Sequence, residues 1–230
     1  MTDTAADPLP HVEDWVFDLD NTLYPASCRL FDQVERRMGE FICEYLNLSW
    51  DDARALQKRY FREHGTTLRG LMTVNGLDPQ LFLDYVHDID LTVIDPCHSL
   101  DDALARLDGR KLIFTNGSVR HAERVLERIG IAHHFSDVVD IVASNYVPKP
   151  DREVYRRMID RFGIDPARSA MIEDMARNLE PAYELGMTTI WVRNTIEWAV
   201  PASEASYIHF AVDDLGSWLS DVADARAAAR

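Results

Sequence analysis

The sequence has few cysteines and no metal-binding cysteine pattern. Cys28, Cys43 and Cys97 are widely separated and odd in number, and none lies in a C-x-x-C or Cys/His spacing. This distribution argues against a zinc site and against a disulfide framework. We therefore expect three small, buried, reduced side chains of the kind found in a cytoplasmic protein.

Basic residues are also scarce, because 24 Lys and Arg face 39 Asp and Glu and the formal net charge is -15. A nucleic-acid polymer is excluded as the expected partner, since its binding sites require clustered Lys and Arg. A single small phosphate remains compatible with this charge. A divalent cation or a compact basic site holds such an anion whatever the net charge of the molecule.

Long apolar runs are absent. No stretch of the sequence approaches the ~20 residues that cross a bilayer. The opening "MTDTAADPLP" lacks the basic region and the apolar core of a signal peptide. We therefore expect a cytoplasmic protein with no membrane partner. At 230 residues the chain is long enough for one α/β domain with an insertion.

Short apolar segments alternate with helical patterns along most of the chain. Strands are predicted at 14–19, 111–115, 138–143, 170–173, 188–192 and, more weakly, 207–212. Helices are predicted between them, at 99–107, 119–130, 151–162 and 176–185, with a last helix in the alanine-rich tail. Such alternation predicts an α/β fold with a parallel sheet covered on both faces.

Residues 24–95 break this alternation. They contain no convincing strand, and helical patterns cover 28–46, 50–64 and 79–88. A helical insertion of this size predicts a second small domain that sits over the sheet. The predicted division is a core of residues 1–23 and 96–230, and a helical domain of residues 24–95.

Polar residues gather where the predicted strands end. Because ligands of parallel α/β sheets bind just beyond the carboxyl ends of the strands, we expect these side chains to converge on one edge. The set comprises Asp18 and Asp20 after the first strand, Thr115, Asn116 and Gly117 after the second, Lys149 after the third, and Glu173 and Asp174 after the fourth.

The acidic members of this set suit phosphoryl transfer. The Asp18 carboxylate can attack phosphorus and form an aspartyl-phosphate. Asp20 can donate a proton to the leaving oxygen and later accept one from water. Acids around a phosphate require a cation, and Mg²⁺ prefers carboxylate and phosphate oxygens. We expect Asp174 to be its side-chain ligand opposite Asp18, with Glu173 in a supporting or water-mediated position.

Four other residues are expected to hold the phosphate. Thr115 supplies a hydroxyl, and the turn through Asn116 and Gly117 supplies backbone N–H groups. Lys149 supplies a fixed positive charge between two prolines that stiffen its backbone. Electrostatic positioning of this kind accounts for most of phosphoryl-transfer catalysis.

The segments "FDLDNTLY", "FTNGS", "YVPKP" and "MIEDMARNL" resemble, in this order, the four motifs of the haloacid dehalogenase superfamily. The resemblance spans nearly the whole chain. It implies a Rossmann-like core, a helical cap inserted after the first motif, a Mg²⁺ cofactor and the residue roles given above. It also implies that the backbone carbonyl of Asp20 binds the metal. An aspartate at position 20 implies a phosphatase, because dehalogenases carry a different residue there.

The variant "DNTLYP", with Asn21 where many members have glycine, and the stretch "HGTTLRGLM" are similar to the pyrimidine 5'-nucleotidase branch. Asparagine tolerates the unusual backbone angles of a tight turn. The resemblance implies a nucleotide such as UMP or CMP as the substrate and a monomer or homodimer. Arg69 in this stretch is predicted either to contact the nucleotide or to be a helix-surface charge.

Three other functions fit the same residues. They are a phosphatase for a sugar phosphate or phosphoglycolate, a phosphomutase, and a binding module that has lost turnover. The histidines offer no further site in the sequence. His133 and His134 are expected to diverge as a solvated surface pair, and the others, His87 and His121 among them, have no ligand spacing.

Overall fold

The structure is a computed structural model that describes residues 7–194, 199–200 and 205–230. In this part of the chain, six strands form one parallel sheet of order β3-β2-β1-β4-β5-β6. They are β1 (Asp14–Phe17), β2 (Arg110–Phe114), β3 (Asp137–Val139), β4 (Ser169–Glu173), β5 (Thr188–Val192) and β6 (Phe210–Val212). The predicted α/β fold with a Rossmann-like parallel sheet is therefore confirmed.

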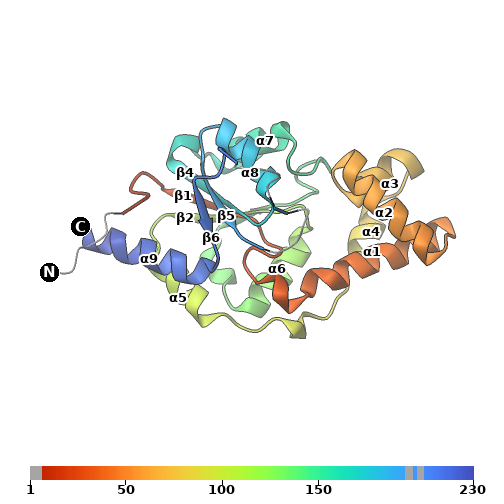
Figure 1. Ribbon diagram of the computed structural model, residues 1–230, viewed down its shortest axis with the longest axis horizontal. Helices are drawn as coiled ribbons and strands as arrows, with labels where there is room; N and C mark the ends of the chain where they lie inside the picture. The colour runs from red at the N-terminus through yellow and green to blue at the C-terminus, as the bar shows by residue number, and fades with distance from the viewer. Residues whose placement is uncertain (1–6, 195–198, 201–204) are drawn as a thin grey trace.

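Helices cover both faces of the sheet (Figure 1). On one face lie α5 (His98–Arg106), α6 (Val119–Ile129) and α9 (Leu215–Ala228), and on the other lie α7 (Arg152–Phe162) and α8 (Ala176–Glu184). Side chains of β1 alternate between the two faces: Trp15 and Phe17 pack in one apolar cluster and Val16 in the other. Both faces are buried, which is why β1 reads as a continuous apolar run.

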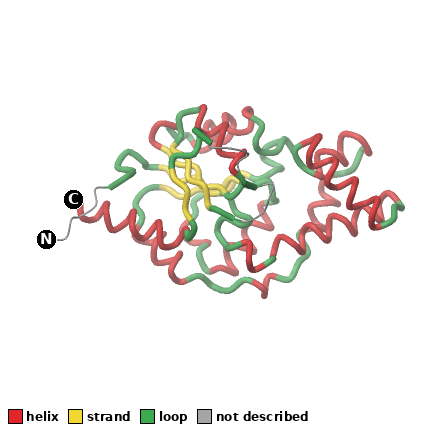
Figure 2. The backbone as a smooth tube through the Cα atoms, in the orientation of Figure 1, coloured by secondary structure: helices red, strands yellow, loops and turns green. Residues whose placement is uncertain are grey.

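Four helices form a separate group beyond one end of the sheet, which we call the helical unit. They are α1 (Leu30–Leu46), α2 (Trp50–His64), α3 (Thr67–Asn75) and α4 (Pro79–Val86). Figure 2 shows helices and loops but no strand in this unit. The short helix α3 is not predicted separately from the sequence; it begins where the Thr66 hydroxyl accepts a hydrogen bond from the Arg69 amide.

The predicted strand at 138–143 is wrong beyond residue 139. β3 ends at Val139, and the following residues form a turn. The buried Asp140 directs this change, because its carboxylate accepts hydrogen bonds from the amides of Val119 and Ala143. A side chain that satisfies nearby backbone donors competes with strand pairing.

The three cysteines are free and half-buried rather than fully buried.

The last helix ties the far end of the chain to the start of β1. The Arg226 guanidinium donates hydrogen bonds to the carbonyls of Leu9 and Val12 and lies 5.0 Å from the centre of the Trp15 ring. It also pairs with Asp7 at 3.3 Å. Contacts of a buried arginine with several acceptors fix the loop that leads into the central strand.

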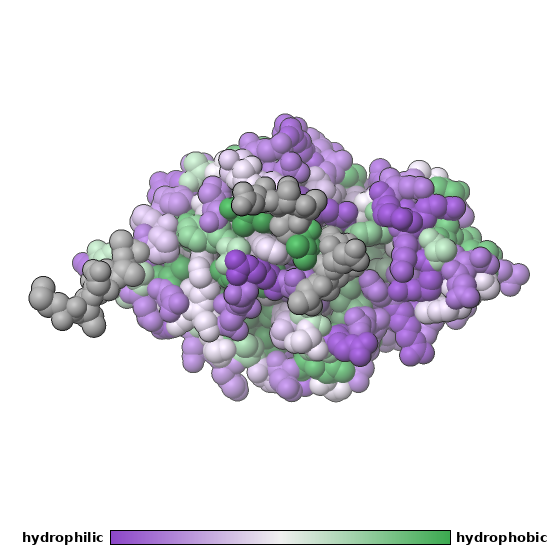
Figure 3. Space-filling view, viewed as in Figure 1, coloured by the Kyte–Doolittle hydropathy of each residue, from purple (hydrophilic) through white to green (hydrophobic). Residues whose placement is uncertain are grey.

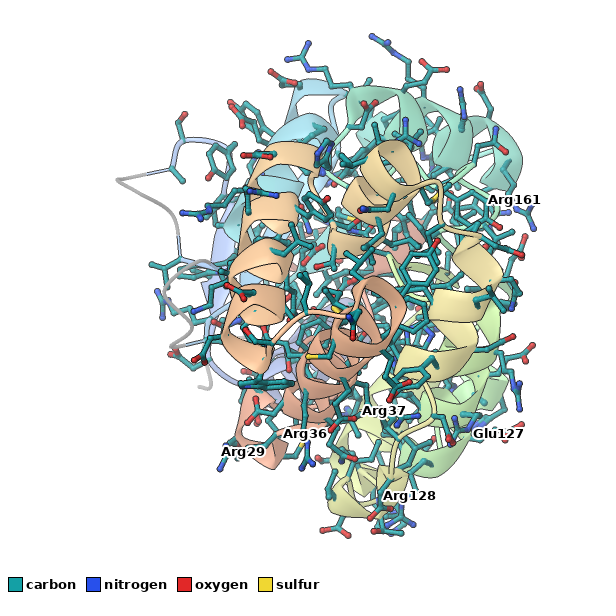
Figure 4. All side chains as sticks on the ribbon, turned by 90° about the vertical axis from the view of Figure 1, so that its right-hand side faces the viewer. Arg29, Arg36, Arg37, Glu127, Arg128 and Arg161 are labelled. Carbon is teal, nitrogen blue, oxygen red and sulfur yellow. The ribbon has the colours of Figure 1, made fainter. Side chains whose placement is uncertain are left out.

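The visible surface is mainly hydrophilic, with scattered hydrophobic residues (Figure 3). Figure 4 looks onto the helical unit, where Arg29 and Arg36 lie at the edge and the Arg37 guanidinium packs on the Tyr85 ring, 4.0 Å from its centre. Single exposed apolar residues among such charges are normal for a protein surface. No helix in the described residues is long and apolar enough to cross a membrane.

Packing between α2 and α3 requires a glycine at position 70. A Cβ atom there would lie 2.4 Å from Cγ of the buried Tyr60 ring. We expect Gly70→Ala to lower the free energy of unfolding by about 1–3 kcal/mol, as overpacking does. Gly216→Ala in α9 is the matched control, since its Cβ meets no atom closer than 3.6 Å. Urea denaturation of both variants checks this, and equal losses would contradict it.

Candidate active site

The candidate site lies at the carboxyl ends of β1, β2 and β4, beneath the helical unit. β1 stands between β2 and β4. At this point the strand order changes sides: β2 and β3 are added on one side of β1, and β4, β5 and β6 on the other. This switch point is the usual ligand site of open α/β sheets. A cavity of about 400 Å³ opens here and is walled by the sheet edge and by the helices α1 to α4. Its volume is in the range of small-molecule sites.

A buried lysine holds the acidic centre together. The Lys149 ammonium donates hydrogen bonds to Asp18 Oδ1 at 2.7 Å, to Glu173 Oε1 at 2.8 Å and to the Phe114 carbonyl at 2.8 Å. All three donors are used, and the side chain is 1% exposed. The second oxygen of Asp18 accepts a hydrogen bond from the Thr22 hydroxyl at 3.1 Å. Lys149 therefore fixes Asp18 at the end of β1.

The pKa values of this centre reflect burial and crowding of negative charge. Burial first, and then the Glu173 carboxylate, raise the pKa of Asp18 to about 7, and Lys149 opposes this rise. Burial first, and then the carboxylates of Glu173 and Asp18, raise the pKa of Asp174 well above its ordinary value. Burial alone lowers the pKa of Lys149, but Asp18 and Glu173 outweigh it and raise the pKa above normal. Three carboxylates are thus grouped around one ammonium, and this imbalance favours protonation of Asp18 and Asp174 when no cation is bound.

Three carboxylates of this centre suit a hard divalent cation. One oxygen each of Asp18, Glu173 and Asp174 lie within 4.8 Å of one another, and all three side chains are buried. An oxygen-only donor set of this kind fits Mg²⁺. Glu173 is heavily used by the protein itself, since its oxygens also accept hydrogen bonds from Asn178 at 2.6 Å and from the Met175 amide at 2.9 Å.

The turn after β2 is held by its own side chains. Thr115 Oγ1 accepts a hydrogen bond from the Gly117 amide at 2.9 Å. The Asn116 side chain binds the backbone of Lys149 on both sides. Its Oδ1 accepts a hydrogen bond from the Lys149 backbone amide at 2.8 Å, and its Nδ2 donates to the Lys149 carbonyl at 3.4 Å. The side chain of Asn116 thus joins two loops, which the sequence did not indicate.

Asp20 lines the same cavity as Lys149 and has its own partners. Its Oδ1 accepts a hydrogen bond from the Tyr24 hydroxyl at 2.6 Å and contacts His121 Nε2 at 2.8 Å. Burial alone raises the pKa of Asp20, but His121 and Tyr24 outweigh it and lower the pKa below its ordinary value. Asn21 follows with φ +60°, which confirms the unusual turn angle predicted for it.

The structure brings the predicted core residues together and leaves Arg69 apart from them. All eight predicted residues at the strand ends line the cavity, namely Asp18, Asp20, Thr115, Asn116, Gly117, Lys149, Glu173 and Asp174. Arg69 is not among the lining residues, and its guanidinium donates to the Tyr146 carbonyl at 3.4 Å. Arg69 thus lies between the helical unit and the loop after β3.

The prediction that His133 and His134 diverge is wrong. Their rings lie 4.0 Å apart, and their Nε2 atoms approach the same Asp101 oxygen at 3.3 and 2.7 Å. A tight 3-10 turn at Ala132–His134 turns both rings toward α5. His134 is largely buried by this contact, whereas His133 remains exposed.

The sequence analysis missed Tyr24, His87 and His121. His121 is 1% exposed and lies on the same buried stripe of α6 as Ala122, Val125, Leu126 and Ile129. A histidine on the apolar face of a helix, directly after a motif at a strand end, is the signal that would have identified it. His87 ends α4 and stacks on His121, with ring centres 4.3 Å apart and planes at 11°.

The parallel sheet and the acidic centre at its carboxyl edge define an α/β protein suited to hold a cation and an anion beside β1. A family model described as haloacid dehalogenase-like hydrolase matches residues 16–186. This match covers most of the chain, and the protein belongs to that family.

Two relatives extend the comparison. Phosphate metabolism protein 8 of Saccharomyces cerevisiae is 27% identical over 197 residues, which are 79% of this chain and 61% of the yeast protein. The N-acetylmuramic acid 6-phosphate phosphatase of Pseudomonas aeruginosa is 32% identical over 119 residues, which are 50% of this chain and 51% of the relative. The matches thus span between about half and three fifths of the relatives' own lengths.

Solved structures share the fold. The crystal structure of CbbY from Rhodobacter sphaeroides in complex with phosphate superposes with a TM-score of 0.62 at 15% sequence identity. The match covers 91% of this chain and 95% of the other. At this identity the likeness shows the architecture alone, which agrees with the topology described above.

The His87 ring predicts a pH-dependent loss of stability. Burial first, and then His121 and Arg124, lower its pKa to about 3, and Asp20 opposes this effect. The unfolded chain therefore binds more protons than the folded protein from the ordinary pKa near 6.5 downward, and stability falls as the pH drops through this range. His87→Phe keeps a flat ring that does not titrate, and we expect it to lose less stability between pH 7 and 5.

Urea denaturation at several pH values measures this difference. His98→Phe is the matched control, because His98 is exposed in the first turn of α5 and should leave the pH dependence unchanged. Parallel loss of stability in the wild type and in His87→Phe would remove His87 as the titrating group.

Proposed function

We propose that the protein is a Mg²⁺-dependent phosphatase that hydrolyses a small phosphomonoester through an aspartyl-phosphate on Asp18. The observation that carries this proposal is the buried Asp18 carboxylate, held by the Lys149 ammonium at 2.7 Å and grouped with two further carboxylates. The phosphatase named among the relatives supports the same reaction.

In the proposed cycle Asp18 attacks phosphorus, and the bond between phosphorus and the leaving oxygen breaks. Asp20 gives its proton to that oxygen. It then takes a proton from the water that attacks phosphorus, so that the bond to Asp18 breaks and inorganic phosphate leaves. The lowered pKa of Asp20 keeps its carboxylate ionised, which is the form that accepts a proton in the second step. For the first step, the negative phosphate raises the pKa of Asp20 when it binds, since like charges disfavour ionisation.

The other residues of the centre hold charge and geometry. Thr115 and the backbone of Gly117 face the cavity where the phosphate oxygens would bind. Asp18 and Asp174, with the carbonyl of Asp20 and with Glu173 in support, would hold Mg²⁺. The bound ion offsets the charge of the phosphate and of the carboxylates. Lys149 keeps Asp18 in place and supplies a fixed positive charge.

The helical unit is proposed to act as a cap that reads the leaving group, with domain boundaries at residues 24 and 95. Its part of the cavity wall combines apolar and aromatic side chains with nearly as many polar ones, which lie on α1 and α2, at the start of α3 and at His87. The apolar members include Phe31, Phe61 and Phe82, and the polar ones include Gln57 and Lys58. A flat base would stack on the aromatic members of this wall and find hydrogen-bond partners for its edges among the polar ones.

We therefore propose a pyrimidine nucleoside 5'-monophosphate, such as UMP or CMP, as the substrate. A sugar phosphate is the second candidate, because one relative is named for N-acetylmuramic acid 6-phosphate. The two substrates would share every core residue and differ in their contacts with the helical unit.

Removal of the nucleophile tests the mechanism. We expect Asp18→Asn to reduce phosphate release to below about a thousandth of the wild-type rate while the fold is kept, because the amide cannot attack phosphorus. Treatment of the wild type with EDTA should stop turnover, and added Mg²⁺ should restore it. Asp137→Asn on the exposed start of β3 is the matched control. Phosphate release that survives in Asp18→Asn, or that ignores EDTA, would refute the mechanism.

A panel of phosphorylated metabolites tests the substrate. We expect the highest kcat/KM for pyrimidine nucleotides. For Arg69→Ala we expect KM to stay unchanged for these and for an aryl phosphate, because its guanidinium lies outside the cavity and donates to the Tyr146 carbonyl. Arg62→Ala, at an exposed site on α2, is the control. A sugar phosphate at the top of the panel would replace the nucleotide proposal. A rise in KM of about tenfold for nucleotides alone, the size expected from the loss of one charged hydrogen bond, would instead assign Arg69 to substrate binding.

A further inference from the structure

We infer that Tyr24 and His121 are positioning residues that lock Oδ1 of Asp20, so that Oδ2 is the oxygen that transfers the proton. This inference rests on the proposed phosphatase function, in which Asp20 is the acid and base. It also gives the helical unit a role, because the His87 ring stacks on the His121 ring and holds its orientation.

Two donors meet on one oxygen of Asp20. The Tyr24 hydroxyl lies 2.6 Å and His121 Nε2 lies 2.8 Å from Oδ1. Both donor side chains are buried, at 4% and 1% exposure. A carboxylate oxygen that accepts two short hydrogen bonds is held in orientation, and its lone pairs are already used.

The other oxygen faces the phosphate-binding turn. Oδ2 of Asp20 lies beside Gly117, 3.7 Å from the position that a Cβ on that glycine would take. Among the hydrogen bonds of the described residues, none ends on this oxygen. Gly117 and Thr115 line the same cavity as Asp18. Oδ2 is therefore the carboxylate oxygen available to a substrate oxygen or to a water at phosphorus.

Packing, rather than a second hydrogen bond, orients the His121 ring. Its Nδ1 is buried without a hydrogen-bond partner in the part of the chain that the structure describes. The ring is instead covered by His87 at the end of α4, in a nearly parallel stack with centres 4.3 Å apart. Loss of this cover would free the ring to rotate away from Asp20, since no other polar contact of His121 restrains it.

The end of α4 is itself fixed to α6 by polar contacts. His87 Nδ1 lies 3.0 Å from Ser118 Oγ, and the Arg124 guanidinium donates to the His87 carbonyl at 2.7 Å. Arg124 also donates to the Ile89 carbonyl at 3.3 Å. Docking of the helical unit therefore completes the support of Asp20, and it does so through His87, which itself lines the cavity.

A positioning role can be recognised from how the rate of leaving-group release depends on the leaving group. Proton donation speeds the departure of a poor leaving group such as an alkoxide by about 10²–10⁴, and a good leaving group such as nitrophenolate gains little from it. Misplacement of Asp20 should thus slow an alkyl phosphate far more than an aryl phosphate. Simple damage to the fold would slow both substrates alike.

The experiment compares single-turnover release of the leaving group from UMP and from p-nitrophenyl phosphate, with β-glycerophosphate in place of UMP if the wild type does not turn UMP over. We expect Tyr24→Phe and His121→Phe each to lower the ratio of the alkyl to the aryl rate at least tenfold. His121→Gln, whose amide nitrogen can reach the place of Nε2, should restore most of this ratio. KM should change little in all three variants.

Val125→Ala is the matched control, because it weakens the same buried face of α6 one turn further along. It should leave the ratio unchanged. An unchanged ratio in Tyr24→Phe, which removes a single oxygen atom, would overturn the inference even if His121→Phe fails to fold. Equal slowing of both substrates would overturn it as well.

Failure of the proposed function is distinct from these outcomes. A wild type that releases no leaving group from any phosphomonoester in the presence of Mg²⁺ would refute the function itself. An active wild type with an inactive Asp18→Asn variant and an unchanged rate ratio would refute the positioning role alone.

Discussion

The site depends on one buried ammonium, that of Lys149, between two carboxylates. It touches groups at the ends of β1, β2 and β4, and its own loop follows β3. Removal of one partner from a buried ion pair leaves a charge without compensation, which is far more costly than the pair itself. The strand ends can therefore shift only together, and the excess of negative charge around Lys149 makes the site receptive to a cation.

Under the proposed mechanism, chemistry and recognition would come from different parts of the chain. The groups proposed to react stand on short loops at the edge of a sheet that is buried on both faces, so their positions are fixed by the core. The opposite wall of the cavity comes from the helices α1 to α4. The stack between His87 and His121 is a contact between these two parts next to Asp20.

Strand ends were predictable because apolar runs give way to polar residues there, and the eight residues predicted on this ground all line the cavity. The turn after Val139 was not, since "DIVAS" has the apolar character of a strand and only the hydrogen bonds of Asp140 reveal a turn. The contact of Asp20 with His121 joins positions 101 residues apart, and no local pattern encodes such a distance. The place of Arg69 depended in the same way on how the helical unit docks.

The hydrogen bonds of Arg226 to the loop before β1 affect the order in which the chain folds during its synthesis. The carbonyls that it binds lie 217 and 214 positions earlier in the sequence. β1 also finds its neighbour β4 only after residue 169 has been made. On the ribosome, the segment that bears Asp18 thus emerges long before β4 and α9, which secure it, because contacts so distant in sequence form late. The nascent chain should keep the loop before β1 unsecured until α9 docks.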